Sequence, residues 1–185
     1  IYMPFALGTH CARIAHELGI PVLGCYHVSA ENITFNAKMK YVPGATPAMY
    51  QLLKVYHYKP EWINNIHCPS RCIASTLMGH LYNQNLHVIS NGYDPAFKRI
   101  DNVKIPDGCE DKVIVTSVGR LTEEKRQGLI IKAVAKSKYR DRISLFLAGK
   151  GPKQEEYEKL AKELNVDLHI VFLSQEELVN LLNAS

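Results

Sequence analysis

The chain has 185 residues, which corresponds to one full domain or two small ones at roughly 100–200 residues per domain. Its composition, 46% hydrophobic and 22% charged, excludes disordered, collagen-like and coiled-coil chains. The 22 basic residues against 18 acidic ones give a net charge of +4, and they are scattered along the chain. This charge permits an anionic ligand or a membrane surface and does not favour nucleic acid.

Five cysteines form an odd and sparse set with no signal peptide before them, which predicts a reducing cytosolic compartment without disulfides. No apolar run reaches the roughly 18–20 residues that span a bilayer, so we expect any membrane contact to be peripheral. The chain opens on Ile1-Tyr2-Met3-Pro4 without an initiator methionine, and we expect it to be part of a longer protein.

The first half predicts alternating helices and strands with parallel pairing. Residues 29–45 lack a clean period and indicate a long loop with room for a helical turn. Around this loop we predict a helix over 6–18, a strand over 22–26, a helix from an N-cap at Thr46 to about Tyr58, a strand over 62–67, a helix over 71–82 capped at Ser70, and a strand over 86–89.

The second half is more regular. Residues 93–111 have the proline, glycine and mixed charges of a linker, so we divide the chain into domains 1–94 and 112–185 joined by a linker over 95–111. Strands are predicted over 113–118, 143–148 and 168–172, with helices over 123–138, over 153–164 and from Gln175 after a Ser174–Glu177 capping box. The alternation predicts an α/β fold with parallel sheets.

The sharpest motif is the segment Gly119-Arg120-Leu121-Thr122-Glu123-Glu124-Lys125, which follows a predicted strand. Glycine frees the backbone for a turn, Thr122 is predicted to cap the next helix, and a helix N-terminus favours anions. Arg120 and Lys125 would add two cations, enough to hold a diphosphate. The alternative is a well-capped first turn with both cations on a solvated surface.

Four motifs, in order, resemble glycosyltransferase family 4. They are the segments Cys25-Tyr26-His27-Val28, His67-Cys68-Pro69-Ser70, Val88-Ile89-Ser90-Asn91-Gly92-Tyr93-Asp94, and Gly119–Lys125 followed by Leu145-Phe146-Leu147-Ala148-Gly149-Lys150-Gly151-Pro152. Ser90 stands where the family usually has proline. The resemblance covers nearly the whole chain and implies the GT-B fold, which consists of two Rossmann-like parallel-sheet domains.

The resemblance also implies site residues. Arg120 and Lys125 match the basic pair that holds the donor diphosphate, and Gly119 allows close approach of the backbone. His27 matches the acceptor-side histidine at the catalytic cleft, and Glu31 is a weaker acceptor-side match. The family's glycine-rich loop would lie before Ile1 and its acidic motif after Ser185.

The implied function is retaining transfer of a hexose from a nucleotide-diphosphate sugar, taken to be a UDP-sugar, to a lipid or saccharide hydroxyl. The resemblance implies no cofactor and no metal ion. We expect a cytoplasmic protein that contacts the inner face of the membrane peripherally, with no nucleic-acid partner. The alternatives are a non-catalytic Rossmann-like module that binds a nucleotide or a partner, and, ranked last, a sugar-nucleotide epimerase.

Two further groups of residues each admit a functional and a purely structural interpretation. His67, Cys68 and Cys72 suggest zinc only weakly, because no second cluster stands at zinc-finger spacing. A basic and aromatic segment is either a membrane-surface patch or an ordinary helix whose aromatic residues face the core. Its members are Lys38, Lys40, Tyr41, Lys54, Tyr56, His57, Tyr58 and Lys59.

Overall fold

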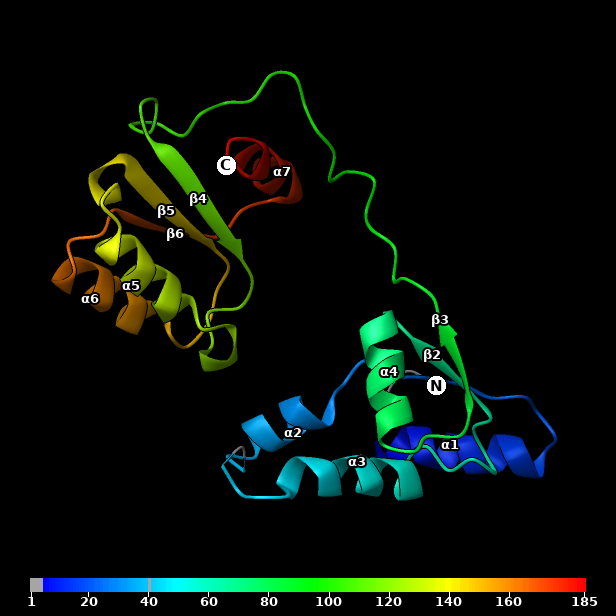
Figure 1. Cartoon of the computed structure of the whole chain (residues 1–185). Coiled ribbons are helices and arrows are strands. Elements are labelled where there is room, and N and C mark those ends of the chain that lie inside the picture. The colour runs from blue at the N-terminus through cyan, green and yellow to red at the C-terminus, as the bar shows by residue number, and fades with distance from the viewer. Residues whose placement is uncertain (1–4, 40) are drawn as a thin grey trace. The chain divides into compact units, whose positions relative to one another are not determined.

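The computed structural model describes residues 5–39 and 41–185, so the opening Ile1–Pro4 and Lys40 of the basic and aromatic segment lie outside the described residues. The chain divides into two compact units, Ile1–Gly92 and Tyr93–Ser185 (Figure 1). The division falls two residues before the boundary expected at position 94. Each unit has its own three-stranded sheet and its own core.

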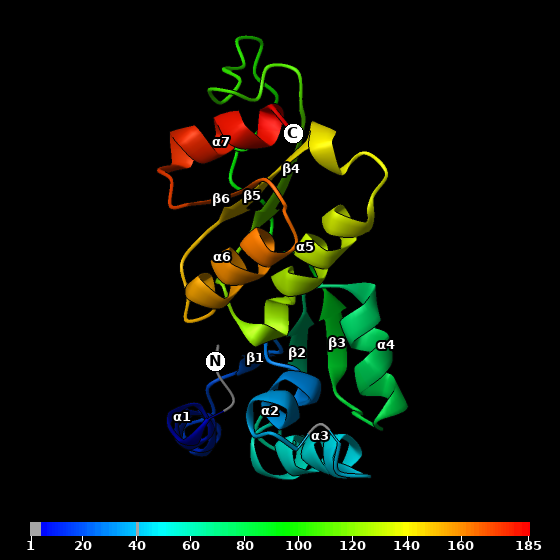
Figure 2. The ribbon, with the colours of Figure 1, turned by 90° about the vertical axis from the view of Figure 1, so that its left-hand side faces the viewer.

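The first unit contains a parallel sheet in the order β1-β2-β3. Helices α2 and α3 lie side by side, and α4 packs beside β2 and β3 (Figures 1 and 2). The elements are α1 (Ala6–Glu17), β1 (Leu23–Cys25), α2 (Ala30–Asn36), α3 (Ala45–Tyr56), β2 (Asn65–Cys68), α4 (Arg71–Gly79) and β3 (Asn85–Val88).

Buried tyrosines form the centre of the first core. Tyr26 stacks on Tyr50 with 6.5 Å between ring centroids and contacts Tyr58 at 5.3 Å and Tyr82 at 6.2 Å. Two of these phenols are satisfied by backbone carbonyls, because Tyr58 donates to Cys25 at 2.9 Å and Tyr82 donates to Tyr50 at 2.9 Å. Such pairing offsets the cost of burying a hydroxyl group.

Two predictions in the first unit are wrong in detail. The expected loop contains α2, whose N-cap Ser29 accepts a hydrogen bond from the amide of Asn32 at 3.3 Å. The helical period was hidden because the polar Thr34 is buried and bonds to Thr46 at 3.1 Å. Thr46 therefore does not cap α3, whose N-cap is Gly44 at φ 78°.

The second unit contains a parallel sheet in the order β4-β5-β6. Helices α5 and α6 cover one face and α7 covers the other (Figure 1). The central strand β5 is buried over nearly its whole length. The elements are β4 (Val113–Val118), the 3₁₀ turn η1 (Glu123–Lys125), α5 (Gln127–Lys136), the 3₁₀ turn η2 (Arg140–Arg142), β5 (Ile143–Ala148), α6 (Gln154–Glu163), β6 (Leu168–Val171) and α7 (Gln175–Asn183).

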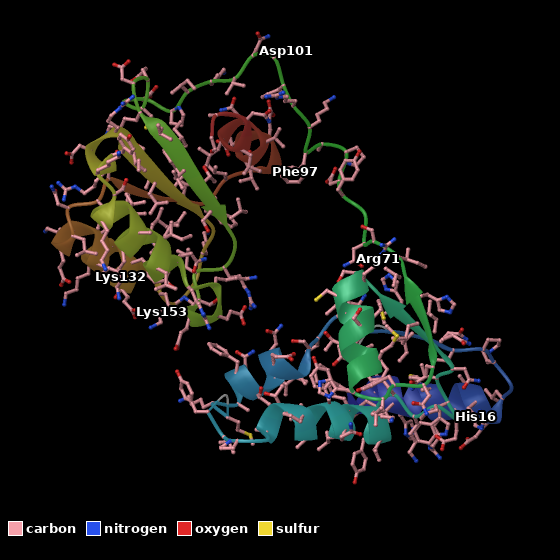
Figure 3. The ribbon with its side chains drawn as sticks, viewed as in Figure 1. His16, Arg71, Phe97, Asp101, Lys132 and Lys153 are labelled. Atoms are coloured by element: carbon pink, nitrogen blue, oxygen red, sulfur yellow. The ribbon has the colours of Figure 1, made fainter. Side chains whose placement is uncertain are left out.

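The segment expected as a linker hydrogen-bonds to α7. Asn180 donates to the carbonyl of Lys104 at 2.7 Å and accepts from its amide at 2.9 Å. Asn183 likewise donates to the carbonyl of Lys98 at 3.0 Å and accepts from the amide of Ile100 at 3.2 Å. Phe97 and Asp101 mark the course of this segment in Figure 3. Two asparagines thus satisfy backbone groups that no strand pairs.

The predicted helix over 123–138 is wrong at its beginning. Residues 123–125 form the 3₁₀ turn η1, Arg126 adopts a left-handed φ of 54°, and α5 begins at Gln127. An α-helix cannot continue through a left-handed residue, so the two pieces are separate. At the other end of the unit, the Ser174–Glu177 capping box is confirmed.

Candidate functional site

Two glycine turns meet at the carboxyl ends of β4 and β5. Gly119 follows β4 at φ 147° and Gly149 follows β5 at φ 155°, both in a region that L side chains rarely adopt. A Cβ on Gly149 would lie 2.1 Å from the carbonyl oxygen of Gly119, and one on Gly151 would lie 2.3 Å from that of Leu121. The two backbones can therefore approach this closely only because positions 149 and 151 are glycine.

Hydrogen bonds to the turn after β5 and to helices α5 and α6 hold the turn after β4 in place. The amide of Leu121 donates to the carbonyl of Lys150 at 3.0 Å, and the amide of Lys153 donates back to the carbonyl of Leu121 at 3.1 Å. Gln127, 1% exposed, donates through Nε2 to the carbonyl of Arg120 at 2.9 Å. The hydroxyl of Tyr157 donates to the carbonyl of Thr122 at 3.2 Å. These bonds position the turn before any ligand arrives.

Both predicted cations lie on this turn. The guanidinium group of Arg120 donates to the carboxylate of Glu124 at 3.0 Å, yet its side chain is 75% exposed. Lys125 folds back over Gly119, with its Cε 4.0 Å from where a Cβ would stand. The predicted cap is wrong, because Thr122 precedes η1 without a side-chain capping bond and its Oγ1 is buried.

His27 lies in the first unit, directly after β1. The amide of Tyr26 donates to the carbonyl of His67 at 3.0 Å, which extends the pairing of β1 with β2 to the residue before His27. The imidazole rings of His27 and His67 are 5.4 Å apart, and Cys25 completes a set whose ligand atoms lie within 4.8 Å of one another. Burial, and then the neighbouring His67, lower the pKa of His27, so its ring is neutral near pH 7.

Glu31 lies in the first turn of α2, in the same unit as His27. The hydroxyl of Tyr50 donates to both of its carboxylate oxygens, at 2.8 and 3.0 Å. Burial, and then the bond to Glu31, raise the pKa of Tyr50. The carboxylate thus has a structural partner, and its weak match to an acceptor-side role stays a prediction.

The structure does not bring together the cysteines that the sequence suggested for zinc. His67 and Cys68 are neighbours on β2, so they point to opposite faces of the sheet, and Cys68 is buried in the core whereas His67 is half-buried. Cys72 is exposed on α4. All five cysteines are free thiols in the part of the chain that the structure describes.

The basic and aromatic segment divides between core and surface. Tyr58 is buried in the core, whereas Tyr41 and Tyr56 are 84% and 63% exposed. Lys54 donates to the carbonyl of Leu81, and the ammonium group of Lys59 lies 4.6 Å from the ring centre of Trp62. The core alternative is therefore confirmed for Tyr58, whereas a membrane-surface role of the exposed tyrosines stays a prediction.

Sequence reasoning missed two supporting parts of these sites. Gly149 and Gly151 belong to one of the four motifs, but their contact with Gly119 and Leu121 could be predicted only from the register of β4 and β5. The meeting of Cys25 and His67 needed the register of β1 and β2. A strand puts residues two apart on one face, so the Cys25–His27 spacing was a usable signal.

Comparisons with known proteins agree with the family resemblance of the sequence. Residues 99–185 match the model of the family "Glycosyl transferases group 1". The alpha-monoglucosyldiacylglycerol synthase of Streptococcus pneumoniae is 28% identical over 91% of this chain and 40% of its own length. The putative glycosyltransferase EpsF of Bacillus subtilis is 32% identical over 52% of this chain and 27% of its own length.

A solved structure supports the fold. Anabaena HepE, crystallised with UDP and glucose, matches 100% of this chain and 50% of its own with a TM-score of 0.71 at 16% identity. Residues 99–185 are therefore similar to the group 1 glycosyltransferases, and the chain has the fold of a GT-B glycosyltransferase, as the sequence predicted. It spans less than half the length of the two curated relatives, and the narrower assignment to family 4 stays a prediction. Among the described residues, no helix combines the length and apolarity needed to cross a bilayer.

Proposed function

We propose that this chain belongs to a retaining glycosyltransferase that moves a hexose from a UDP-sugar to a lipid or saccharide hydroxyl. The observation that carries the proposal is the turn after β4, where two exposed cations stand on a backbone fixed by the glycine turn after β5. The relatives support it, since one is named as a monoglucosyldiacylglycerol synthase and the other as a putative glycosyltransferase, and the solved neighbour holds UDP and glucose.

Arg120 and Lys125 would hold the diphosphate of the donor. As the glycosidic bond breaks, negative charge grows on the leaving diphosphate, and fixed cations stabilise that charge without a metal ion. Arg120 would exchange the carboxylate of Glu124 for phosphate oxygens. This exchange costs little, because exposed ion pairs contribute only about 0.2–1 kcal/mol.

His27 would act on the acceptor side. A half-buried, neutral imidazole at the carboxyl end of β1 can accept a hydrogen bond from a sugar or acceptor hydroxyl. Glu31 would assist on the same side. The nucleotide-sugar donor and a lipid or glycan acceptor are thus the expected partners, and neither a cofactor nor a metal ion is required for this chemistry.

A lipid acceptor would bring the protein to a membrane surface. The exposed Tyr41 and Tyr56, with Lys38 nearby in sequence, are of the kinds that lie at a lipid interface. The streptococcal relative is named as a synthase of a glucosylated diacylglycerol. These observations support the proposal that the protein contacts the cytoplasmic face of the membrane peripherally.

A transfer assay tests the proposal. The longest reading frame that contains this sequence is expressed and incubated with radiolabelled UDP-glucose and vesicles containing diacylglycerol, with and without EDTA. We expect labelled glycolipid that EDTA does not abolish and that is lost when Arg120 or Lys125 becomes alanine. His27→Ala should slow transfer more than it weakens UDP binding. UDP binding without transfer to any lipid or saccharide acceptor would instead identify a binding module.

A further inference from the structure

Strand register gathers three metal-ligand side chains on one accessible face of the first sheet. Cys25 and His27 are two residues apart and so point to the same side of the extended chain. Cys25 is the register partner of His67 on the neighbouring parallel strand, which adds a third side chain to that side. All three are half-buried, whereas Tyr26, Ile66 and Cys68 on the opposite side are fully buried in the core.

A backbone carbonyl prepares His67 for coordination. Its Nε2 lies 2.7 Å from the carbonyl oxygen of Ile89. A carbonyl can only accept, so Nε2 carries the proton and the neutral ring keeps its lone pair on Nδ1. Histidines that bind metals characteristically donate their other ring nitrogen to a carbonyl or carboxylate, which fixes the tautomer and the ring orientation.

We propose that Cys25, His27 and His67 form a binding site for a thiophilic divalent cation of the Zn²⁺ class. One thiolate and two imidazoles are the ligand types that zinc prefers, and three protein ligands leave a fourth position open. Mg²⁺ and Ca²⁺ prefer oxygen ligands and should not bind here. On binding, the Zn–S bond replaces the S–H bond of Cys25, and the proton passes to solvent.

The set needs only a small adjustment to close on the ion. One candidate ligand atom from each residue lies within 4.8 Å of the others, whereas tetrahedral Zn²⁺ with bonds of about 2.0–2.3 Å requires separations of roughly 3.3–3.6 Å. Side-chain rotation about fixed backbones can supply that change. Two hydrogen bonds fix these backbones. One runs from the amide of Tyr26 to the carbonyl of His67, and the other from the hydroxyl of Tyr58 to the carbonyl of Cys25.

Metal binding would withdraw His27 from the acceptor. This consequence rests on the proposed function, because it assumes that His27 acts on the acceptor hydroxyl. The site would then make the enzyme sensitive to inhibition by zinc, while donor binding in the second unit would continue. Binding of the cation itself depends on no part of the proposed function and is tested separately.

The test uses the 185-residue chain, freed of metal with EDTA and kept reduced by a phosphine. Co²⁺ is titrated as a spectroscopic probe, and Zn²⁺ is then added in competition. We expect one equivalent of Co²⁺, a thiolate-to-cobalt charge-transfer band in the near ultraviolet, and displacement by Zn²⁺. Cys25→Ser should remove the band, and His67→Gln, which keeps a donor for the Ile89 carbonyl, should weaken binding at least about tenfold.

Cys72→Ser is the matched control, because Cys72 is exposed and lies outside the set. It should bind like the wild type, and circular dichroism should show that every variant is folded. A cobalt band that survives Cys25→Ser, a loss of the band in Cys72→Ser, or no saturable binding to the folded wild-type chain would each overturn the proposal. None of these results depends on glycosyl transfer, so the outcome is separate from that of the transfer assay.

Discussion

At the residue scale, the glycine at position 149 determines whether the proposed donor turn can form. The carbonyl oxygen of Gly119 occupies the space where its Cβ would stand, at 2.1 Å, and backbone atoms cannot rotate out of the way as a side chain can. The proposed donor turn therefore depends on two segments, although Arg120 and Lys125 both lie on the first.

Gly149→Ala should disrupt the contact between the two turns. We expect it to lower the free energy of unfolding of the second unit by at least about 2 kcal/mol, because a backbone shift and a disfavoured φ are both forced. UDP binding should weaken as well. Urea unfolding followed by circular dichroism measures the first effect.

Gly128→Ala is the control in the same unit. Gly128 lies in α5, and an added Cβ would meet Tyr157 at 3.4 Å, an ordinary contact. Alanine is favoured over glycine within a helix by up to about 1 kcal/mol, so this variant should be at least as stable as the wild type. Equal stability of the two alanine variants would contradict the described contact between the turns.

The chemical roles of single residues could be predicted from the sequence, but the residues that lie beside them in space could not. Arg120 and Lys125 were predicted together because they lie within one short turn. His67 was associated with Cys68, its neighbour in sequence, whereas the sheet pairs it with Cys25. Adjacent strand residues point to opposite faces, and register between distant strands cannot be obtained from a local pattern.

At the element scale, a charged cluster joins the amino ends of the three strands of the second sheet. The ammonium group of Lys112, before β4, lies 2.6 Å from the carboxylate of Asp167, before β6. The hydroxyl of Ser144 on β5 donates to the same carboxylate at 2.5 Å. Burial opposes the charge, but these two hydrogen bonds hold the pKa of Asp167 below its usual value.

Asp167→Asn should lower the free energy of unfolding at pH 7, by less than about 1 kcal/mol because the pair is one-third exposed. The native pKa is lowered from 3.8, so the stabilisation is present above that value and is lost as the pH falls through the native pKa. The difference from wild type should therefore shrink in acid. Urea unfolding at pH 7 and near pH 3 measures it.

Asp141→Asn provides the comparison, since Asp141 pairs with Arg140 at 3.2 Å but is 85% exposed. We expect no measurable change in stability at either pH. A loss of stability at pH 7 equal to that of Asp167→Asn would show that the cluster across the strands stabilises the fold no more than an exposed ion pair does.

The bounds of elements with a clear local pattern could be predicted, whereas those of elements shaped by other contacts could not. The strands over 113–118 and 143–148 agree with the prediction because short, largely apolar runs are typical of buried parallel strands. Helix α2 was missed because the buried Thr34 makes its inner face polar. The beginning of α5 was misplaced because Arg126 adopts a left-handed conformation, which a non-glycine residue does not signal in the sequence.

At the scale of the whole molecule, the two units carry different parts of the proposed chemistry. The order of the four motifs was enough to predict the GT-B class, which the family match and the fold of HepE bear out. The two cations that would hold the donor lie in the unit 93–185, together with every contact that fixes their turn. His27 and Glu31 lie in the other unit.

The proposed donor site requires that the turn after β4 binds a nucleotide diphosphate. Calorimetric titration of UDP into the 185-residue chain tests it most directly, with GDP and ADP as comparison nucleotides. Arg140→Ala is the matched control for Arg120→Ala, because Arg140 is also ion-paired but precedes β5, at the amino end of the sheet.

We predict saturable binding of UDP that Arg120→Ala and Lys125→Ala each weaken roughly 10- to 100-fold, the loss of about one charge-assisted hydrogen bond. Arg140→Ala should bind like the wild type. Wild-type affinity in both Arg120→Ala and Lys125→Ala, or an equal loss in Arg140→Ala, would contradict the assignment of the donor site to this turn.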